Sequence, residues 1–345
     1  MRVTAPPAMP TITLPPPDDV ATAPPRVDDA GAPLAHRGGK NRIGDRMLKA
    51  LASGSGVVVV VLVCLIAAFL LWQALPAVAD DKSSFLFSND WSVDGKALHF
   101  GIAGLLWTTL IVSSIAMVIA VPIAIGIALF ITLYAPARLA RPVAYTVDLL
   151  AAIPSIVYGI WGIGVLAPAL EPVQRTLYHL SAIPIFKDGT VLRGSIFDAG
   201  IVLAVMILPI ITAICRDVFE RTPSQNIEGA LALGATRWEM IRLAVLPYGR
   251  AGIVSGAMLG LGRALGETVA MYLILSAPGP GAPFSTSIFH GGETFASKIA
   301  NNAAEFANPK STGAYIAAGL MLFVLTFVVN ASARAIVNRR KDFRA

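Results

Sequence analysis

Six long apolar segments constrain this chain more strongly than any other feature. They lie at residues 56–79, 101–134, 142–170, 199–215, 251–276 and 313–337. A helix of about 20 apolar residues crosses the ~30 Å hydrocarbon core of a bilayer. Only 14% of the residues are charged, whereas a soluble domain carries about 25%. The sequence therefore predicts an all-α polytopic membrane protein with six transmembrane helices.

Two of these segments contain a proline that interrupts a regular helix. The second segment is long enough to tilt or bend, and a kink is expected at Pro122. The third is broken at Ile153-Pro154-Ser155. Pro154 frees a backbone carbonyl, and Ser155 and Tyr158 supply hydroxyl groups near the break. These hydroxyls either face a polar cavity or satisfy the kink inside the helix bundle, and the sequence leaves both readings open.

The residues before the first apolar segment divide into two parts. Residues 1–40 contain nine prolines and few large apolar side chains, which predicts a disordered Pro-rich tail. Residues 41–55 are basic, with apolar residues at helical spacing. This pattern predicts an amphipathic helix at the membrane surface ahead of the first span. A six-helix domain is then expected over 56–338, followed by a basic tail at 339–345.

Lysine and arginine are distributed unequally over the two sides of the predicted membrane domain. With the N-terminus inside and the count begun at Arg37, 17 of them lie on the cytoplasmic side and 7 on the outer side. The cytoplasmic loops of membrane proteins carry the excess of these residues. Both termini are therefore expected to be cytoplasmic, together with the segment between the fourth and fifth spans.

That cytoplasmic segment, 222–247, is too polar for lipid but carries helix signals. Thr222 is a candidate N-cap, with Pro223 at the first helical position. Gly234 interrupts the pattern, and Thr236 opens a second helical run that is expected to end before Pro247. The segment therefore predicts two short helices joined at a glycine. On spacing alone, an ordinary amphipathic connector fits equally well.

Arg263 and Glu267 place two charges inside the fifth apolar segment. Each charge costs roughly 2.5–3.5 kcal/mol at the bilayer centre on insertion scales. In a continuous helix, residues four apart lie on the same face about one turn from each other. The pair is then either a salt bridge that fixes this helix to a neighbour or part of an anion pathway. For a pathway, the guanidinium offers a planar fork of hydrogen-bond donors.

Glycines recur every four residues in the same region, at 252, 256 and 260 and again at 262 and 266. Small residues at this spacing let helix backbones approach closely. The fifth helix is therefore expected in a bundle interior, at a subunit interface rather than against lipid. The two cysteines and the histidines show no spacing that suggests a metal site.

The segment Glu228-Gly-Ala-Leu-Ala-Leu-Gly234, followed by Leu246-Pro247, resembles the EAA loop of bacterial ABC importer permeases. Gly229 and Ala244 depart from that pattern, each being smaller than the usual residue. The resemblance implies that the loop docks into a cleft of an ATPase subunit and transmits its closure. The residues implied in this role are Glu228, Ala230, Leu233, Gly234, Ala235, Thr236, Leu246 and Pro247.

Four motifs together resemble the phosphate-specific ABC importer permeases of the PstC type. They are Leu150–Gly162, Ile207–Thr212, Ala232–Glu239 and Gly260–Thr268. The likeness runs from about the second span to the C-terminus. It implies a type I importer permease fold in a bacterial cytoplasmic membrane, and phosphate import by alternating access. Carried over by motif, it implies a transport pathway formed by Arg263, Glu267, Thr268, Ser155 and Tyr158.

The same resemblance implies partners. A homologous permease of the PstA type, two copies of a phosphate ATPase and an extracytoplasmic phosphate-binding protein would complete the importer, surrounded by lipid and without nucleic acid. The sequence has no Gly-x-x-x-x-Gly-Lys-Ser/Thr loop. ATP and Mg²⁺ are therefore expected on the partner ATPases, with no cofactor on this chain and no enzymatic activity of its own.

Two alternatives to a phosphate permease stay open. One is a permease for another oxyanion, such as molybdate or sulfate. The other is a membrane scaffold that senses phosphate without setting the rate of transport. An intramembrane enzyme is disfavoured, because the apolar segments contain no HExxH, Ser/Lys or Asp/Asp arrangement.

Overall fold

The computed structural model describes residues 42–81, 83–93, 98–179, 183–186, 193–279, 282–303, 306 and 309–342. The predicted Pro-rich tail at 1–40 and the last residues of the basic tail, 343–345, lie outside these ranges. The chain divides into two units inside its first helix, the first ending at Leu62 and the second beginning at Val63. Among the described residues, the first unit is a single helical stretch and the second holds every other element.

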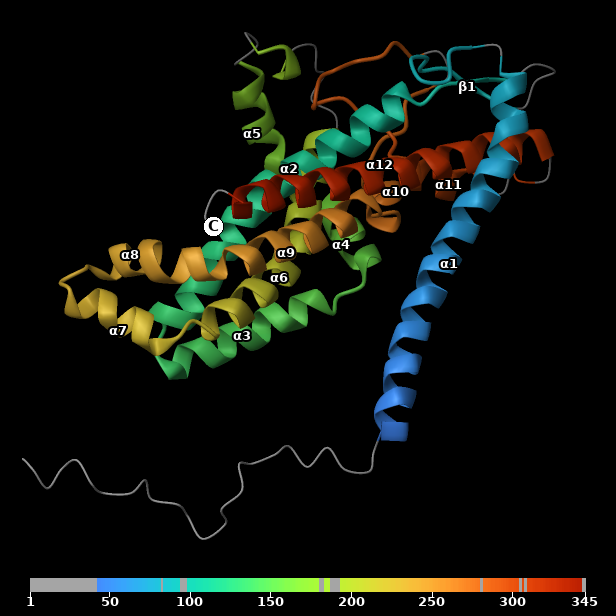
Figure 1. Cartoon of the computed structure of the whole chain (residues 1–345). Coiled ribbons are helices and arrows are strands. Elements are labelled where there is room, and N and C mark those ends of the chain that lie inside the picture. Colours follow the sequence, from blue (N-terminus) through green and yellow to red (C-terminus); the bar gives the residue numbers. More distant parts are fainter. Residues whose placement is uncertain are drawn as a thin grey trace, which may run out of the picture. The chain divides into compact units, whose positions relative to one another are not determined.

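The described part of the chain is helical apart from one pair of two-residue strands (Figure 1). In chain order the elements are α1 (Arg42–Asp80), β1 (Trp91–Ser92), β2 (His99–Phe100), α2 (Ala103–Leu129), η2 (Phe130–Tyr134), α3 (Ala137–Ala151), α4 (Ser155–Trp161), η3 (Gly162–Leu166), α5 (Ala167–Tyr178), η4 (Pro184–Phe186), α6 (Ile196–Glu220), α7 (Ser224–Ala232), α8 (Arg237–Met240), η5 (Ile241–Val245), α9 (Leu246–Leu265), α10 (Val269–Ile274), α11 (Phe295–Asn301) and α12 (Pro309–Asp342).

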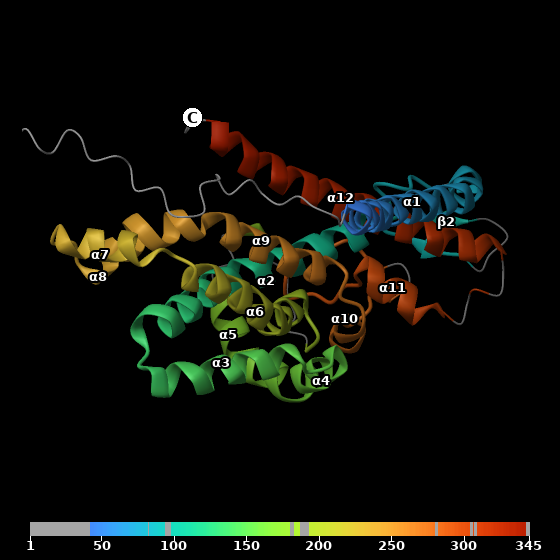
Figure 2. The same ribbon diagram turned by 60° about the horizontal axis from the view of Figure 1, so that its bottom comes forward.

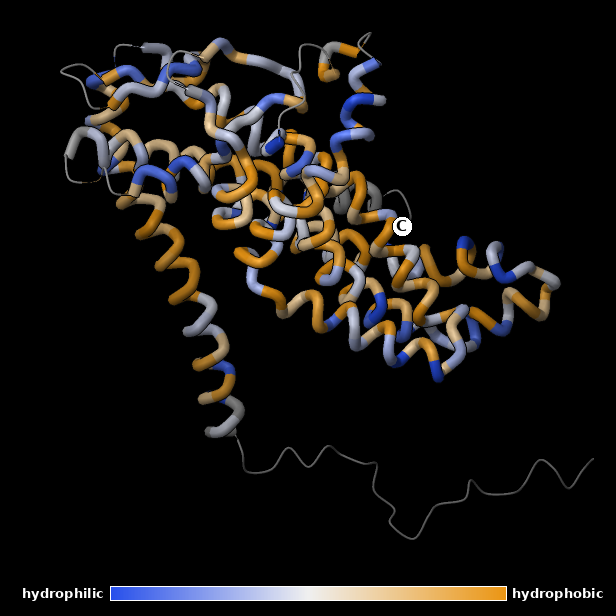
Figure 3. Tube along the Cα trace, turned by 180° about the vertical axis from the view of Figure 1, so that it is seen from behind, coloured by the Kyte–Doolittle hydropathy of each residue, from blue (hydrophilic) through white to orange (hydrophobic). Residues whose placement is uncertain are grey.

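Six helical segments in the described ranges are long and apolar enough to span a membrane, which confirms the predicted number. They are Arg46–Asp80, Ala103–Tyr134, Ser155–Tyr178, Ile196–Glu220, Arg237–Leu265 and Ser311–Ala335. Apolar residues follow these helices, and hydrophilic residues gather near α7 and α8 (Figure 3). The membrane-spanning architecture thus follows from the hydropathy of the sequence.

The first helix differs from the prediction of a separate surface helix at 41–55. α1 runs without interruption from Arg42 to Asp80. Ser55, which lies between two glycines, keeps its hydroxyl inside the helix by donating to the Ala52 carbonyl at 2.9 Å. No proline adjoins either glycine, and the helix continues through this stretch.

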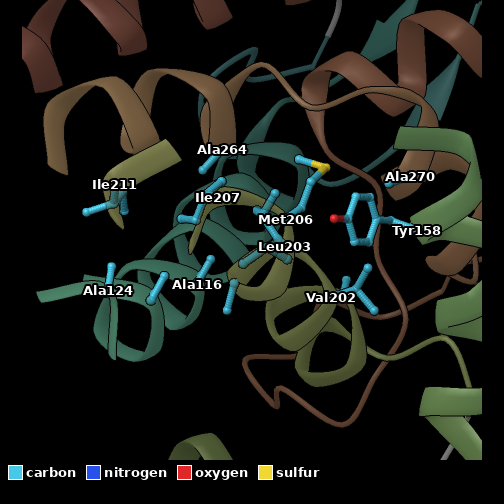
Figure 4. Close-up of a cluster of buried hydrophobic side chains, with 14 of the residues drawn as sticks. Ala116, Ala124, Tyr158, Val202, Leu203, Met206, Ile207, Ile211, Ala264 and Ala270 are labelled. Carbon is cyan, nitrogen blue, oxygen red and sulfur yellow. The ribbon is translucent and has the colours of Figure 1, made fainter. Parts of the chain in front are cut away.

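The core of the second unit lies where α6 packs against both α2 and α9 (Figure 2). Four alanines spaced by four residues on α2 are fully buried, and they are Ala116, Ala120, Ala124 and Ala128. They belong to one apolar cluster with Val202, Leu203 and Ile207 of α6 (Figure 4). Small residues in such a row let two helices pack closely without a hydrophobic driving force from water.

The first glycine series on α9 packs inside this chain. A Cβ at Gly252 would lie 2.3 Å from Val218 Cγ2 of α6, and one at Gly260 would lie 2.7 Å from Ile211 Cδ1. Gly256 faces Ile214 in the same way. The stripe predicted at a subunit interface is therefore the contact between α9 and α6.

The bounds predicted for the third span, 142–170, are wrong. α3 ends at Ala151 as a separate amphipathic helix that packs against α6, and the spanning segment begins only at Ser155 and continues to Tyr178. Asp148 of α3 pairs with Arg216 of α6 at 3.4 Å. Proline disfavours a helical backbone at the residue before it. The chain therefore turns at Ile153-Pro154 instead of continuing α3 through the membrane.

Candidate functional site

The charged pair lies at a break between two helices. α9 ends at Leu265, residues 266–268 are not helical, and α10 begins at Val269. The prediction of one continuous helix over 251–276 is therefore wrong, and Arg263 and Glu267 do not share a helical face. Glycine is the residue most often found just beyond a helix end. Gly266 occupies that place here.

Each charge of the pair lies at a helix end that carries the opposite partial charge. Arg263 is in the last turn of α9, where exposed carbonyls favour a cation. Glu267 lies just before α10, and its Oε1 accepts a hydrogen bond from the Ala270 backbone N–H at 3.2 Å. The break thus gives both charges polar partners within an apolar segment, which lowers the cost of keeping them there.

The two side chains differ in their surroundings. Glu267 is buried, with 8% of its surface exposed, whereas Arg263 is exposed. Within the described ranges, no ion pair within 4 Å joins them. The salt-bridge reading of the pair therefore has no support in this conformation. The Thr268 hydroxyl closes the turn by donating to the Gly266 carbonyl at 3.1 Å.

The structure brings α4 directly against α10. A Cβ at Gly159 would lie 2.8 Å from Leu273 Cδ1 and 3.2 Å from Ala270 Cα. Tyr158 is on the turn next to this contact, and its ring lies beside Val202 and Met206 of α6 (Figure 4). The helix that carries the predicted pathway residues Ser155 and Tyr158 therefore packs against α10, the helix that follows the break.

Tyr158 satisfies the proline kink. Its hydroxyl donates a 2.8 Å hydrogen bond to the Leu150 carbonyl. This is the carbonyl that a residue at position 154 would bond in a regular helix, and Pro154 has no N–H to offer. The sequence left open whether this hydroxyl faces a polar cavity or bonds within the helix bundle. In the structure, the Tyr158 hydroxyl bonds the kink carbonyl within the bundle. Ser155 begins α4 in a half-buried position.

The 222–247 segment folds into two short helices joined at Gly234, as predicted. Gly234 has φ +84°, a left-handed conformation that favours glycine. Thr236 then caps α8: its hydroxyl accepts from Glu239 N at 3.3 Å, while the Glu239 carboxylate accepts from Thr236 N at 2.8 Å. Leu233, just before the glycine, is 91% exposed.

Two details of this segment were predicted wrongly. Thr222 does not cap α7, because Pro223 occupies the cap position and the Thr222 hydroxyl is buried with no partner among the described residues. The second helix does not end before Pro247, because α8 continues through η5 into α9. η5 is a π-helical turn, which is wider than an α-helical turn. Such a turn accommodates a proline that cannot donate to the helix ladder.

A groove of about 430 Å³ lies between α7 and the start of α9. It is lined by Asn226, Ala230, Leu243, Ala244, Pro247 and Tyr248. Ala230 and Pro247 are positions of the EAA-like motif, so the structure brings the two halves of that motif together. Leu243 and Tyr248 were missed from the sequence, because single apolar residues on a helix carry no signal of their own. Their exposure reveals them.

Comparison with known proteins now decides the family. The pattern of the family described as "Binding-protein-dependent transport system inner membrane component" matches residues 120–342. The "Phosphate transport system permease protein PstC 2" of Mycobacterium tuberculosis is 55% identical over 301 residues, which are 86% of this chain and 92% of the relative. The chain belongs to the PstC family of phosphate transport permeases. The PstC protein of Mycobacterium leprae is 52% identical over 86% of this chain and 94% of its own length.

Membership of the PstC family confirms the resemblance found in the motifs. A PstC permease is a membrane transport subunit and not an ATPase, and it carries no cofactor. A solved structure supports the fold alone: a bacterial ABC transporter involved in the import of the acidic polysaccharide alginate aligns with a TM-score of 0.52. That protein is 18% identical to this chain, and the alignment covers 85% of this chain and 99% of the solved chain.

Proposed function

We propose that this PstC-family chain is the permease subunit of an ATP-driven importer that moves inorganic phosphate into the cytoplasm by alternating access. The observation that carries the proposal is the break between α9 and α10. It places an exposed arginine in the last turn of a membrane-spanning helix and a buried glutamate just beyond the end of that helix, and PstC relatives at 55% identity are phosphate transport permeases. Charged residues inside membrane segments mark substrate pathways.

The two charged residues have different tasks in this proposal. Arg263 has no ion pair within the described ranges, so its donor fork is available for phosphate oxygens. Glu267 uses one carboxylate oxygen to hold α10, and the other accepts a hydrogen from protonated phosphate. The hydroxyls of Tyr158 and Thr268 are occupied by backbone carbonyls in this conformation. They support the pathway by fixing the kink and the break.

The α7–α8 segment is proposed as the ATPase coupling loop. Leu233 and the groove lined by Ala230 and Pro247 form its docking surface, together with Glu228, Gly234, Ala235, Thr236 and Leu246. The helix that starts at Arg237 reaches Leu265 without a break, a length of about 43 Å at 1.5 Å per residue. Arg263 therefore moves with the end of a helix that begins in the coupling loop.

The remaining partners follow from the surfaces that this chain leaves open. Gly262 has no atom within 4 Å of its Cβ position, and Leu259 and Arg263 nearby are exposed. We assign this face of α9 to a homologous permease of the PstA type. Two ATPases would bind on the cytoplasmic side, where the basic residues place both termini. A phosphate-binding protein would bind the outer loops, including 277–312.

Replacing Arg263 with Gln tests this function. Membrane vesicles that contain the assembled complex should lose phosphate uptake by roughly tenfold or more, since a charge-assisted hydrogen bond contributes about 1.5–3 kcal/mol. Arg175→Gln, at an exposed arginine paired only with Glu171, is the matched control and should leave uptake unchanged.

The double variant Arg263→Gln/Glu267→Gln separates pathway from structure. Because the two side chains form no ion pair here, the double variant should remain inactive. Recovery of uptake in the double variant would show that the pair is structural. Wild-type uptake by Arg263→Gln alone would remove Arg263 from the mechanism.

A further inference from the structure

A second site lies at the other end of α10 from Glu267. A cavity of about 540 Å³ is formed there by the β1 region, the start of α2, the chain after α10 and residues of α11. Ile196, the first residue of α6, also lines it. α6 runs about 37 Å from this residue to the coupling-loop end at 1.5 Å per residue. The cavity is therefore on the membrane side opposite the ATPase coupling loop.

The walls of this cavity are fixed by close backbone contacts. A Cβ at Gly104 would lie 2.1 Å from Asn89 Oδ1, and one at Gly292 would lie 2.5 Å from Thr108 Oγ1. A Cβ at Gly291 would lie 2.1 Å from the Ser276 carbonyl oxygen. At these three glycines the backbone therefore lies close to the Asn89 side chain, the Thr108 side chain and the Ser276 carbonyl, which also line the cavity. A Cβ at any of these glycines would come too close to its neighbour, so the wall would have to shift.

A shielded ion pair lies in the cavity wall. Lys298 Nζ is 2.8 Å from Glu293 Oε2, and the two side chains are only 14% and 10% exposed. Asn301 donates to the other Glu293 oxygen at 3.3 Å, and Lys298 lies 5.4 Å from the centre of the Trp91 ring. The ammonium group has three donors, and Glu293 takes one of them.

Two further donors in the wall have no acceptor. The indole N–H groups of Trp91 and Trp107 are enclosed and find no hydrogen-bond partner among the described residues, and both residues line the cavity. An indole nitrogen can only donate. Enclosed donors without acceptors are rare in folded proteins and call for an explanation. The cavity therefore has a surplus of donors and a single carboxylate.

We propose that this cavity is an outer receiving site for protonated phosphate, a reading that rests on the proposed function. Lys298 and the two indole groups donate to phosphate oxygens after small side-chain adjustments, and Glu293 accepts a hydrogen from the phosphate. Phosphate keeps at least one proton at neutral pH and sulfate keeps none, so Glu293 disfavours sulfate. The volume also leaves room for several waters of about 30 Å³ each, which suits brief residence.

The position of the cavity fits a step before Arg263. Ser276 lines the cavity just beyond the end of α10, and Glu267 lies before its beginning. The six residues of α10 span about 9 Å. Phosphate released from the outer site thus reaches Arg263 after moving along one short helix, from one donor–carboxylate pair to the next.

Tryptophan fluorescence tests the site directly, because Trp91 and Trp107 lie in its wall. The assembled complex is purified in detergent without the binding protein and titrated with inorganic phosphate, then with sulfate. Phosphate should change the fluorescence, and sulfate should not. Trp107→Phe should reduce the change. Lys298→Gln should raise the half-saturating phosphate concentration roughly tenfold, as expected for losing a charged donor.

The double variant Lys298→Gln/Glu293→Gln distinguishes a binding role of the ion pair from a purely structural one, because it removes both charges and leaves neither of them buried and unpaired. A phosphate titration like that of the wild type in this double variant would overturn the proposal. An equal response to sulfate, or no response of the wild type to phosphate, would do the same.

Arg263→Gln separates this inference from the proposed function. That variant should lose uptake but keep the fluorescence titration, because the two sites are distinct. A wild-type complex that imports phosphate without a titration would overturn the outer site and leave the permease function standing. A complex with the titration but without phosphate uptake would overturn the proposed function.

Discussion

The Glu267 carboxylate accepts a hydrogen bond from the Ala270 backbone N–H at 3.2 Å, across the break between α9 and α10. This contact gives a buried acid in the apolar segment 251–276 a hydrogen-bond donor. The carboxylate lies at the positive end of a short helix and satisfies one of its free N–H groups. The same residue is therefore both a helix cap and the acid of the proposed phosphate pathway.

Substitution of Glu267 separates these two tasks. Glu267→Gln keeps an oxygen that can accept from Ala270 N but removes the charge. We expect phosphate uptake to fall roughly tenfold or more, with little change in the thermal unfolding temperature of the complex. Glu267→Ala also removes the acceptor and should lower stability by about 1 kcal/mol. Full uptake by Glu267→Gln would mean that the carboxylate serves only as a cap.

Tyr158→Phe tests the hydroxyl that satisfies the proline kink. The variant removes the 2.8 Å hydrogen bond to the Leu150 carbonyl and should destabilise the protein by about 0.5–1.5 kcal/mol. Thermal unfolding in detergent measures the change. Tyr145→Phe, at a tyrosine that is 69% exposed on α3, is the control and should be neutral. Equal melting of both variants would show that the kink does not depend on Tyr158.

Gly234→Ala tests the turn between α7 and α8. Alanine at φ +84° costs about 1–2 kcal/mol, so the turn should shift and recovery of the ATPase with the complex should fall. Gly229→Ala is the matched control on α7, where no atom lies within 4 Å of the Cβ position. It should be neutral or stabilise the helix by up to about 1 kcal/mol. Co-purification of the ATPase at wild-type levels with Gly234→Ala would contradict the assigned turn.

Gly252→Ala tests the close contact between α9 and α6. The added methyl would lie 2.3 Å from Val218 Cγ2 and 2.8 Å from its Cβ, and a β-branched side chain has little freedom to move away. We expect a loss of stability of about 1–3 kcal/mol, seen as a lower unfolding temperature. Gly126→Ala on α2, with nothing within 4 Å, is the control. Unchanged melting of Gly252→Ala would show that the helices are more loosely packed.

The sequence and the structure agree best where a local property decides the outcome. Six spans follow from apolar length, and α6 extends the predicted 199–215 segment by a few residues at each end. Gly234 and Thr236 marked the turn and the second helix start correctly, because a glycine and a capping box act within a few residues. The EAA-like motif and the family were also readable, since they are patterns of consecutive residues.

The sequence misled where packing with distant segments decides the outcome. Gly266 is one of several glycines in its apolar segment, and nothing local showed that α9 ends there. Pro154 signalled a break, but only the contact of α3 with α6 shows that Asp148 lies outside the third span. The glycines at 252, 256 and 260 correctly predicted a close helix–helix contact, but the partner is α6 of this chain and not another subunit.

The sequence by itself determined that this chain crosses a membrane six times, carries a coupling-loop motif and places Arg263 and Glu267 in its fifth apolar segment. Only the tertiary structure decided that these two charges lie at the facing ends of two helices, that α4 packs against α10, and that Trp91, Trp107, Glu293 and Lys298 line one cavity. The physical reason is range. Hydropathy and capping act over a few neighbouring residues, whereas a break or a cavity depends on which distant segments pack together.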